Sequence, residues 1–131
     1  FCLSRGLGDV YKRQYFIWFD DREYTLRLTA RCPGVQVLDS VVVHDMGDNR
    51  GVNFAMVDRK SLWKFSYGVR NEASWQLHHR GFLYFMEFGA RLFVSLHRGR
   101  VPLDLRAKLL GKWVKGITFN PKIKYPEAEA A

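Results

Sequence analysis

The stretch WKFSYGVR, residues 63–70, carries a large apolar side chain at every second position. Successive side chains of a β-strand point to opposite faces of a sheet, so this period of two predicts a strand with one buried face. Trp63, Phe65 and Tyr67 would then lie in a core. This is the most regular alternation in the chain, and the fold class predicted below rests on it.

Similar patterns flank this stretch on both sides. Residues 24–31 place Leu26 and Leu28 on one face of a strand and Arg27 and Arg31 on the other. A β-branched run, apolar runs and shorter alternations predict further strands, separated by Gly, Pro, Asp and Asn turn signals. These strands are residues 35–43, 52–56, 82–88, 92–96, 103–109 and 116–119.

The stretch before Gly111 has a helical alternative. Leu105, Leu109 and Trp113 fall on one face of a helix, and Pro102 would sit near its first turn. Gly111 and the β-rich surroundings favour the strand. The sequence therefore predicts an all-β chain, folded as a single small antiparallel barrel or two-sheet sandwich of eight to ten short strands.

The beginning of the chain reads as foreign to this domain. The codons GAT GTG TAT AAG AGA CAG, from the transposon end used to prepare sequencing libraries, encode residues 9–14, and its usual upstream partner encodes residues 4–8. Segments of such origin are set aside in reasoning about the fold. Three parts are predicted: a non-native adapter-derived segment at residues 1–14, a single β domain at 15–120, and a flexible tail at 121–131.

The chain is basic. Its 21 Lys and Arg residues against 13 Asp and Glu residues give a net charge of +8, and leaving out residues 1–14 lowers this to +6. A basic balance favours anionic partners such as nucleic acid, a nucleotide or an anionic membrane surface. Cys32 is the only cysteine after residue 14, so we expect no disulfide framework and a reducing, cytoplasmic location. No apolar run approaches the roughly 20 residues that span a bilayer.

The sequence lacks the common catalytic signatures. It has no Gly-x-Ser-x-Gly elbow, no phosphate loop ending in Gly-Lys-Ser/Thr and no His-Glu-x-x-His. The adjacent His78 and His79 would point to opposite faces of a strand and could not share a metal ion. His44, Asp45 and Asp48 fit a solvated turn better than an acid–base pair. We therefore expect no enzyme activity, no cofactor and no metal site.

Arg27 and Arg31 are the candidate ligand-binding residues. On one face of a regular strand they would lie about 13 Å apart. With Thr25 and Thr29 they form a stripe of hydrogen-bond donors suited to phosphate oxygens. Phe93 is a candidate exposed aromatic on which a nucleobase could stack.

The second half of the chain resembles a known family. Its apolar alternation and glycine positions are similar to those of PilZ domains in the segments GFLYF (81–85), GARLFVSL (89–96), LDLRAK (103–108) and GITF (116–119). The resemblance implies a six-stranded β-barrel that binds cyclic di-GMP. The pattern Arg-x-x-x-Arg, from Arg27 to Arg31, matches the family's first ligand motif and implies that these two side chains grip phosphates. The family's second motif, Asp/Asn-x-Ser-x-x-Gly, has no full counterpart in this chain.

These observations predict a non-catalytic binding module for an anionic ligand. Its specific form would be a degenerate PilZ-like domain in which Arg27 and Arg31 hold a cyclic dinucleotide. One alternative is a nucleic-acid-binding β-barrel, which would lose affinity more steeply with salt because it releases more counterions. The other is a structural or assembly protein, such as a subunit of a phage particle, that forms a homo-oligomer.

Overall fold

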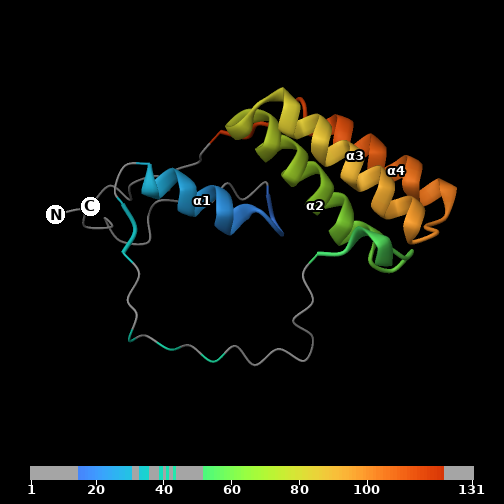
Figure 1. The fold of residues 1–131 in the computed structure, drawn as a ribbon, viewed down its shortest axis with the longest axis horizontal. Coiled ribbons are helices and arrows are strands. Elements are labelled where there is room, and N and C mark those ends of the chain that lie inside the picture. The colour runs from blue at the N-terminus through green and yellow to red at the C-terminus, as the bar shows by residue number, and fades with distance from the viewer. Residues whose placement is uncertain are drawn as a thin grey trace, which may run out of the picture.

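The regular structure of this protein is helical wherever its residues are described. The computed structural model describes residues 15–30, 33–35, 39, 41, 43 and 52–122, and within them no β-strand occurs. The prediction of an all-β barrel or sandwich is therefore wrong. In chain order the elements in Figure 1 are the helix α1 (Asp20–Thr29), the 3₁₀ turn η2 (Phe54–Met56), the helix α2 (Leu62–Trp75), the π-helical turn η3 (Gln76–Arg80), and the helices α3 (Phe82–Arg98) and α4 (Leu103–Lys115).

The stretch at residues 63–70 forms the first turns of α2 rather than a strand. Phe65 and Val69 are buried there, and Ala73 continues the same face four residues later. A spacing of four satisfies both a strand period of two and a helical period near 3.6. Trp63 and Tyr67 separate the two patterns, because the strand prediction places both in a core. Trp63 is 53% exposed, and Tyr67 is half-buried and lies outside the bundle core.

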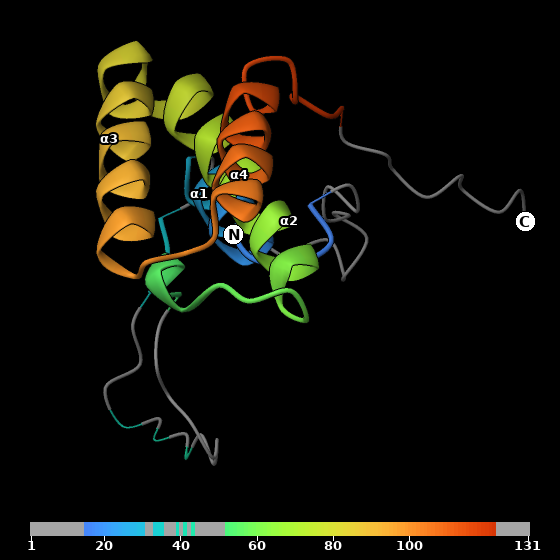
Figure 2. The ribbon, with the colours of Figure 1, turned by 90° about the vertical axis from the view of Figure 1, so that its right-hand side faces the viewer.

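The helices α2, α3 and α4 form a bundle whose core holds most of the buried apolar side chains of the described residues (Figures 1 and 2). Along α3 the buried positions follow intervals of three and four residues, as in an amphipathic helix, and α4 contributes two leucines four residues apart. The strands predicted at 82–88, 92–96 and 103–109 are thus parts of helices. The bundle core comprises Phe65, Val69, Ala73, Phe85, Phe88, Leu92, Leu96, Val101, Leu105 and Leu109, with Val57 from the preceding loop.

Helix α4 packs closely on α3 because Gly89 has no side chain. The Trp113 ring stacks on Phe85 with centroids 4.6 Å apart, and its indole nitrogen donates to the Phe85 carbonyl at 3.2 Å. A Cβ on Gly89 would lie 2.5 Å from Trp113 Cζ2. The helical alternative for this stretch, with Leu105, Leu109 and Trp113 on one face, is the arrangement found. Gly111 lies inside α4 at an exposed position, so its weak helical propensity is outweighed by the packing of its neighbours.

The segment before α1 is fixed to α2 by one buried amide. The Asn71 side chain, fully buried, donates from Nδ2 to the carbonyls of Tyr15 at 2.7 Å, Ile17 at 2.9 Å and Trp18 at 3.0 Å. Trp18 has a φ of 59°, in the left-handed region that side chains other than glycine seldom adopt. Its ring packs edge-on against Phe65, with centroids 5.3 Å apart. These contacts hold the segment in place and set where α1 begins.

Helix α1 replaces the strand predicted at residues 24–31 as far as Thr29. Its first turn carries Asp20, Asp21 and Glu23, and Arg27 lies in its last turn. This order favours a helix, because acidic side chains near the N-terminus and a basic one near the C-terminus complement the helix dipole. In Figure 1, α1 and the α3–α4 pair lie on opposite sides of α2.

The other predicted strands have different outcomes. Residues 52–56 contain the turn η2, and residues 116–119 form a turn after α4 with no strand. Residues 35–43 lie for the most part outside the described residues, and so do residues 44–51.

Candidate anion-binding groove

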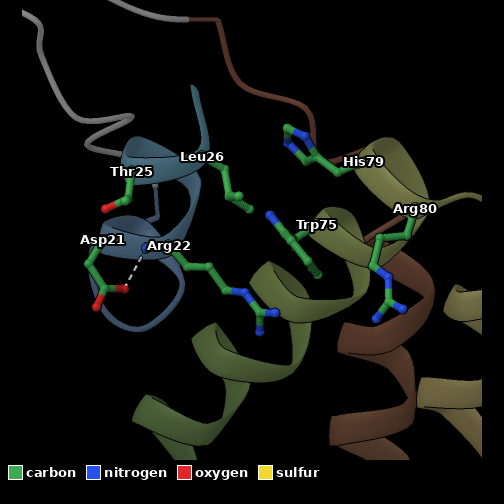
Figure 3. A pocket seen from close by; sticks show the side chains of 7 residues that line it. All are labelled: Asp21, Arg22, Thr25, Leu26, Trp75, His79 and Arg80. Carbon is green, nitrogen blue, oxygen red and sulfur yellow. Dashed lines mark hydrogen bonds between the residues drawn. The ribbon is translucent and has the colours of Figure 1, made fainter. Parts of the chain in front are cut away.

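An open groove of about 680 Å³ lies between α1 and the end of α2 with η3 (Figure 3). Helix α1 supplies four of its lining side chains, at spacings of one, three and one residues, which place them on one side of the helix. The opposite wall comes from the last residue of α2 and the end of η3. The groove is lined by Asp21, Arg22, Thr25, Leu26, Trp75, His79 and Arg80.

The Arg22 guanidinium lies over the Trp75 ring. Its central carbon is 4.2 Å from the ring centroid of Trp75 and 5.8 Å from that of Phe19. Such cation–π contacts hold a guanidinium by its face and leave its N–H edges available. Within the described part of the chain, this guanidinium makes no hydrogen bond and no ion pair. Its donors are therefore free to meet an anion.

Arg80 is placed in a similar way on the other wall. Its guanidinium carbon lies 3.6 Å from the ring centroid of Tyr84, and Nη1 is 3.5 Å from Oε1 of Gln76. The π-helical turn positions it: the Gly81 amide donates to the Gln76 carbonyl at 2.9 Å, a wider loop than in an α-helix. Single π turns within helical segments recur at functional sites. Gly81, with a φ of 100°, then allows the chain to enter α3.

Trp75 carries the most unusual feature of the groove. Its side chain is only 4% exposed, yet its indole nitrogen has no hydrogen-bond partner among the described residues. In Figure 3 this nitrogen faces the space between Leu26 and His79. The His79 ring stacks at 5.9 Å from the Trp75 ring. A buried N–H without an acceptor costs about 1–3 kcal/mol, so an acceptor that reached it from the groove would remove this cost.

The charges around the groove favour an anion. Of the two carboxylates nearby, Asp21 lines the groove, and its Oδ1 accepts the Arg22 backbone N–H at 2.7 Å. Glu72 does not line the groove; its carboxyl is largely buried, and this burial raises its pKa against the opposing effects of Arg91, Gln76 and Arg22. The two groove guanidiniums therefore face one groove carboxylate, a net positive balance.

The structure places the predicted residues elsewhere. Arg27 lies about 140° around α1 from Arg22, with Nε 3.5 Å from Oε1 of the buried Glu23 and its guanidinium 5.4 Å from the Tyr24 ring centroid. Arg31 lies outside the described residues. The separation of about 13 Å assumed a strand, and Arg27 belongs to a helix instead. That Arg27 and Arg31 bind a ligand stays a prediction.

Arg22, Trp75 and Arg80 are not among the binding residues that the sequence predicts. Asp21, Arg22, Thr25 and Leu26 share one face of a helix, but the predicted strand at residues 24–31 separates them. His79 lines the groove. Among the described residues, no group of three or more His, Cys, Asp or Glu side chains could hold a metal ion. The sequence signal for this part of the site is the helical spacing of the groove residues within 20–29.

Comparisons of the chain with family models, with curated proteins and with solved structures find no match. The PilZ resemblance is therefore wrong: no family model supports it, and the segments that carried it form the helices α3 and α4 and a turn. Among the described residues, no helix is both long and apolar enough to cross a membrane.

Proposed function

We propose that this protein is a non-catalytic binding module that takes up a small organic anion in the groove between α1 and η3. The observation that carries the proposal is the buried Trp75 N–H, which has no acceptor among the described residues and lies beside a guanidinium held on the same ring. Arg80 adds a second guanidinium on the opposite wall.

The groove suits a ligand with an anionic end and an apolar or planar body. Phosphate or carboxylate oxygens would accept charge-assisted hydrogen bonds from Arg22 and Arg80 and a neutral one from Trp75. The side chain of Leu26 and the ring of His79 offer a surface for the body of the ligand. Because aromatic rings already hold both guanidiniums, less side-chain entropy is lost on binding.

Isothermal titration of the full chain with pyrophosphate and with adenosine diphosphate tests this proposal. Pyrophosphate offers the anionic end alone, and the nucleotide adds a planar body. We expect Arg22→Gln and Arg80→Gln each to weaken binding about tenfold or more, the usual effect of losing a charged hydrogen bond. Lys60→Gln is the matched control, because Lys60 is an exposed cation outside the groove.

Two outcomes would refute the groove as the site. One is the absence of binding heat with both probes, and the other is an equal loss of affinity in all three variants. Single-stranded RNA that bound with a steep salt dependence would support the nucleic-acid alternative instead. We also propose a cytoplasmic location, supported by the single cysteine after residue 14. Detection of the protein outside the cytoplasm would contradict it.

A further inference from the structure

Helix α3 is apolar over more of its circumference than the bundle core covers. Its buried side chains occupy one arc, and a second arc of about 120° next to it is exposed and, apart from His97, apolar. Leu83, near the start of the helix, is 81% exposed, and Phe93, three turns later, is 56% exposed. The exposed large apolar residues of this arc are Phe82, Leu83, Met86, Phe93 and Val94.

Helix α4 extends this surface. It runs alongside α3 on the side of the bundle that faces away from α1 (Figure 1), and Trp113 and Arg106 of α4 contact Phe85 and His97 of α3. Exposed apolar side chains continue along α4 and into the turn after it. We call the combined exposed surface the α3–α4 face, and its α4 part consists of Leu103, Val114 and Ile117.

The helices that carry the α3–α4 face, and the turn between them, are rich in basic residues. Residues 82–116 contain seven Arg and Lys and only two acidic residues, Glu87 and Asp104. Both acids are already engaged, since Glu87 lies 3.6 Å from Arg91 and Asp104 lies 3.1 Å from Arg59. The cations without these partners are Arg98, Arg100, Arg106, Lys108, Lys112 and Lys115.

Exposed apolar side chains together with excess positive charge indicate what kind of partner covers the α3–α4 face. A second copy of the chain would bring the same positive charges against this face and be repelled. An anionic lipid surface would attract the cations and accept the apolar side chains at the boundary of headgroups and acyl chains. We infer that the α3–α4 face binds the surface of an anionic bilayer, with both helices lying in the interface. This inference is independent of the anion groove, which lies on the α1 side of α2.

Cosedimentation of the full chain with vesicles tests the inference. We expect binding to phosphatidylcholine vesicles that contain about 20% phosphatidylserine, decreasing as salt rises, and little binding to phosphatidylcholine alone. The double variant Leu83→Glu/Phe93→Glu should bind at least about tenfold more weakly, because two side chains no longer enter the lipid. Val35→Glu is the matched control, because Val35 is an exposed apolar residue outside α3 and α4 whose neighbour Gly34 lies near Thr29 of α1.

Equal binding to both kinds of vesicle, full binding by the double variant, or no binding by the unaltered chain would each overturn the inference. So would a mass that rises with protein concentration in the unaltered chain but not in the double variant, since a second copy would then cover the face. If the double variant loses its helical circular dichroism, Lys108→Gln/Lys112→Gln/Lys115→Gln replaces it. That variant should lose binding to anionic vesicles, and unchanged binding would equally overturn the inference.

Discussion

Two glycines within helices of the bundle have opposite surroundings. A Cβ on Gly89 would lie 2.5 Å from the Trp113 ring, whereas a Cβ on Gly111 would meet nothing within 4 Å. We expect Gly89→Ala to lower the free energy of unfolding by about 1–3 kcal/mol through overpacking. Gly111→Ala should raise it by about 0.5–1 kcal/mol, because alanine loses less backbone entropy in a helix. Urea unfolding measures both, and a neutral Gly89→Ala would show that Trp113 can shift at little cost.

The Trp75 indole N–H can be removed without removing an aromatic ring. Trp75→Phe keeps a surface for the Arg22 guanidinium, now 4.2 Å from the indole ring, and deletes the donor that faces the groove. If the donor meets the ligand, we expect the affinity for pyrophosphate to fall about three- to tenfold, the range for one neutral hydrogen bond. Titration calorimetry measures the change. Unaltered affinity in a folded variant would exclude Trp75 as a donor to the anion.

The largely buried carboxyl of Glu72 should make the stability of the protein depend on pH. Burial raises its folded pKa above the ordinary value of 4.5. Folding therefore favours the protonated acid, and stability falls as the pH rises through 4.5 toward the folded pKa. We expect Glu72→Gln to melt at a higher temperature than the unaltered chain near neutral pH, with the difference closing below the ordinary pKa. Thermal melts across this range measure it, and a less stable variant at neutral pH would show that the pairing with Arg91 dominates.

At the scale of elements, the segment before α1 depends on a single side chain of α2. Asn71→Ala would leave the carbonyls of Tyr15, Ile17 and Trp18 without their shared donor. We expect the free energy of unfolding to fall by about 2 kcal/mol or more. Ser66→Ala, on the same helix and half-buried, serves as the control. Limited proteolysis should cut the Asn71→Ala chain near Trp18 first, and resistance equal to that of the control would contradict this role.

The helices can be predicted from the sequence only where a stretch is long enough to distinguish the helical period of about 3.6 residues from the strand period of two. Within residues 63–70, Phe65 and Val69 fit both a strand and a helix, whereas the exposed Trp63 and the half-buried Tyr67 fit the strand alone. Residues 82–88 are apolar except for Glu87, and the intervals of three and four residues emerge only when the window reaches Leu96. For residues 103–109 the sequence itself contains the helical pattern. The low helical propensity of Gly111 argues against a helix there, but the packing of the neighbouring residues outweighs it.

The groove could be predicted from the sequence even less than the helices. Arg22 and Trp75 are more than fifty positions apart, so their contact depends on how α1 lies against α2. No local pattern specifies that arrangement. The net positive charge did favour an anionic ligand, but it could not indicate which of many arginines would have free donors. Arg22 and Arg80 are distinguished from the other arginines by the groove that both line, which forms only when α1 packs beside the end of α2.

At the scale of the whole molecule, the chain divides into a well-packed bundle and a helix held less tightly. Glu23 is the only fully buried residue of α1, whereas α2, α3 and α4 bury a shared apolar core. Regions with few buried apolar contacts open locally more often than the core. The groove lies between these two parts, so a ligand bound there would contact both walls. Binding would therefore be coupled to the stability of α1.

Amide hydrogen exchange measures this coupling. Without ligand, we expect α1 to exchange faster than α2, α3 and α4, because its opening exposes little apolar surface. Saturating pyrophosphate should slow exchange in α1 and at the end of η3, and leave exchange in the core of α3 unchanged, since a ligand stabilises the states that bind it. In the Arg22→Gln chain the slowing should disappear. Uniform slowing across all four helices would mean that the anion stabilises the bundle from another site, and no slowing in α1 would separate that helix from the bound anion.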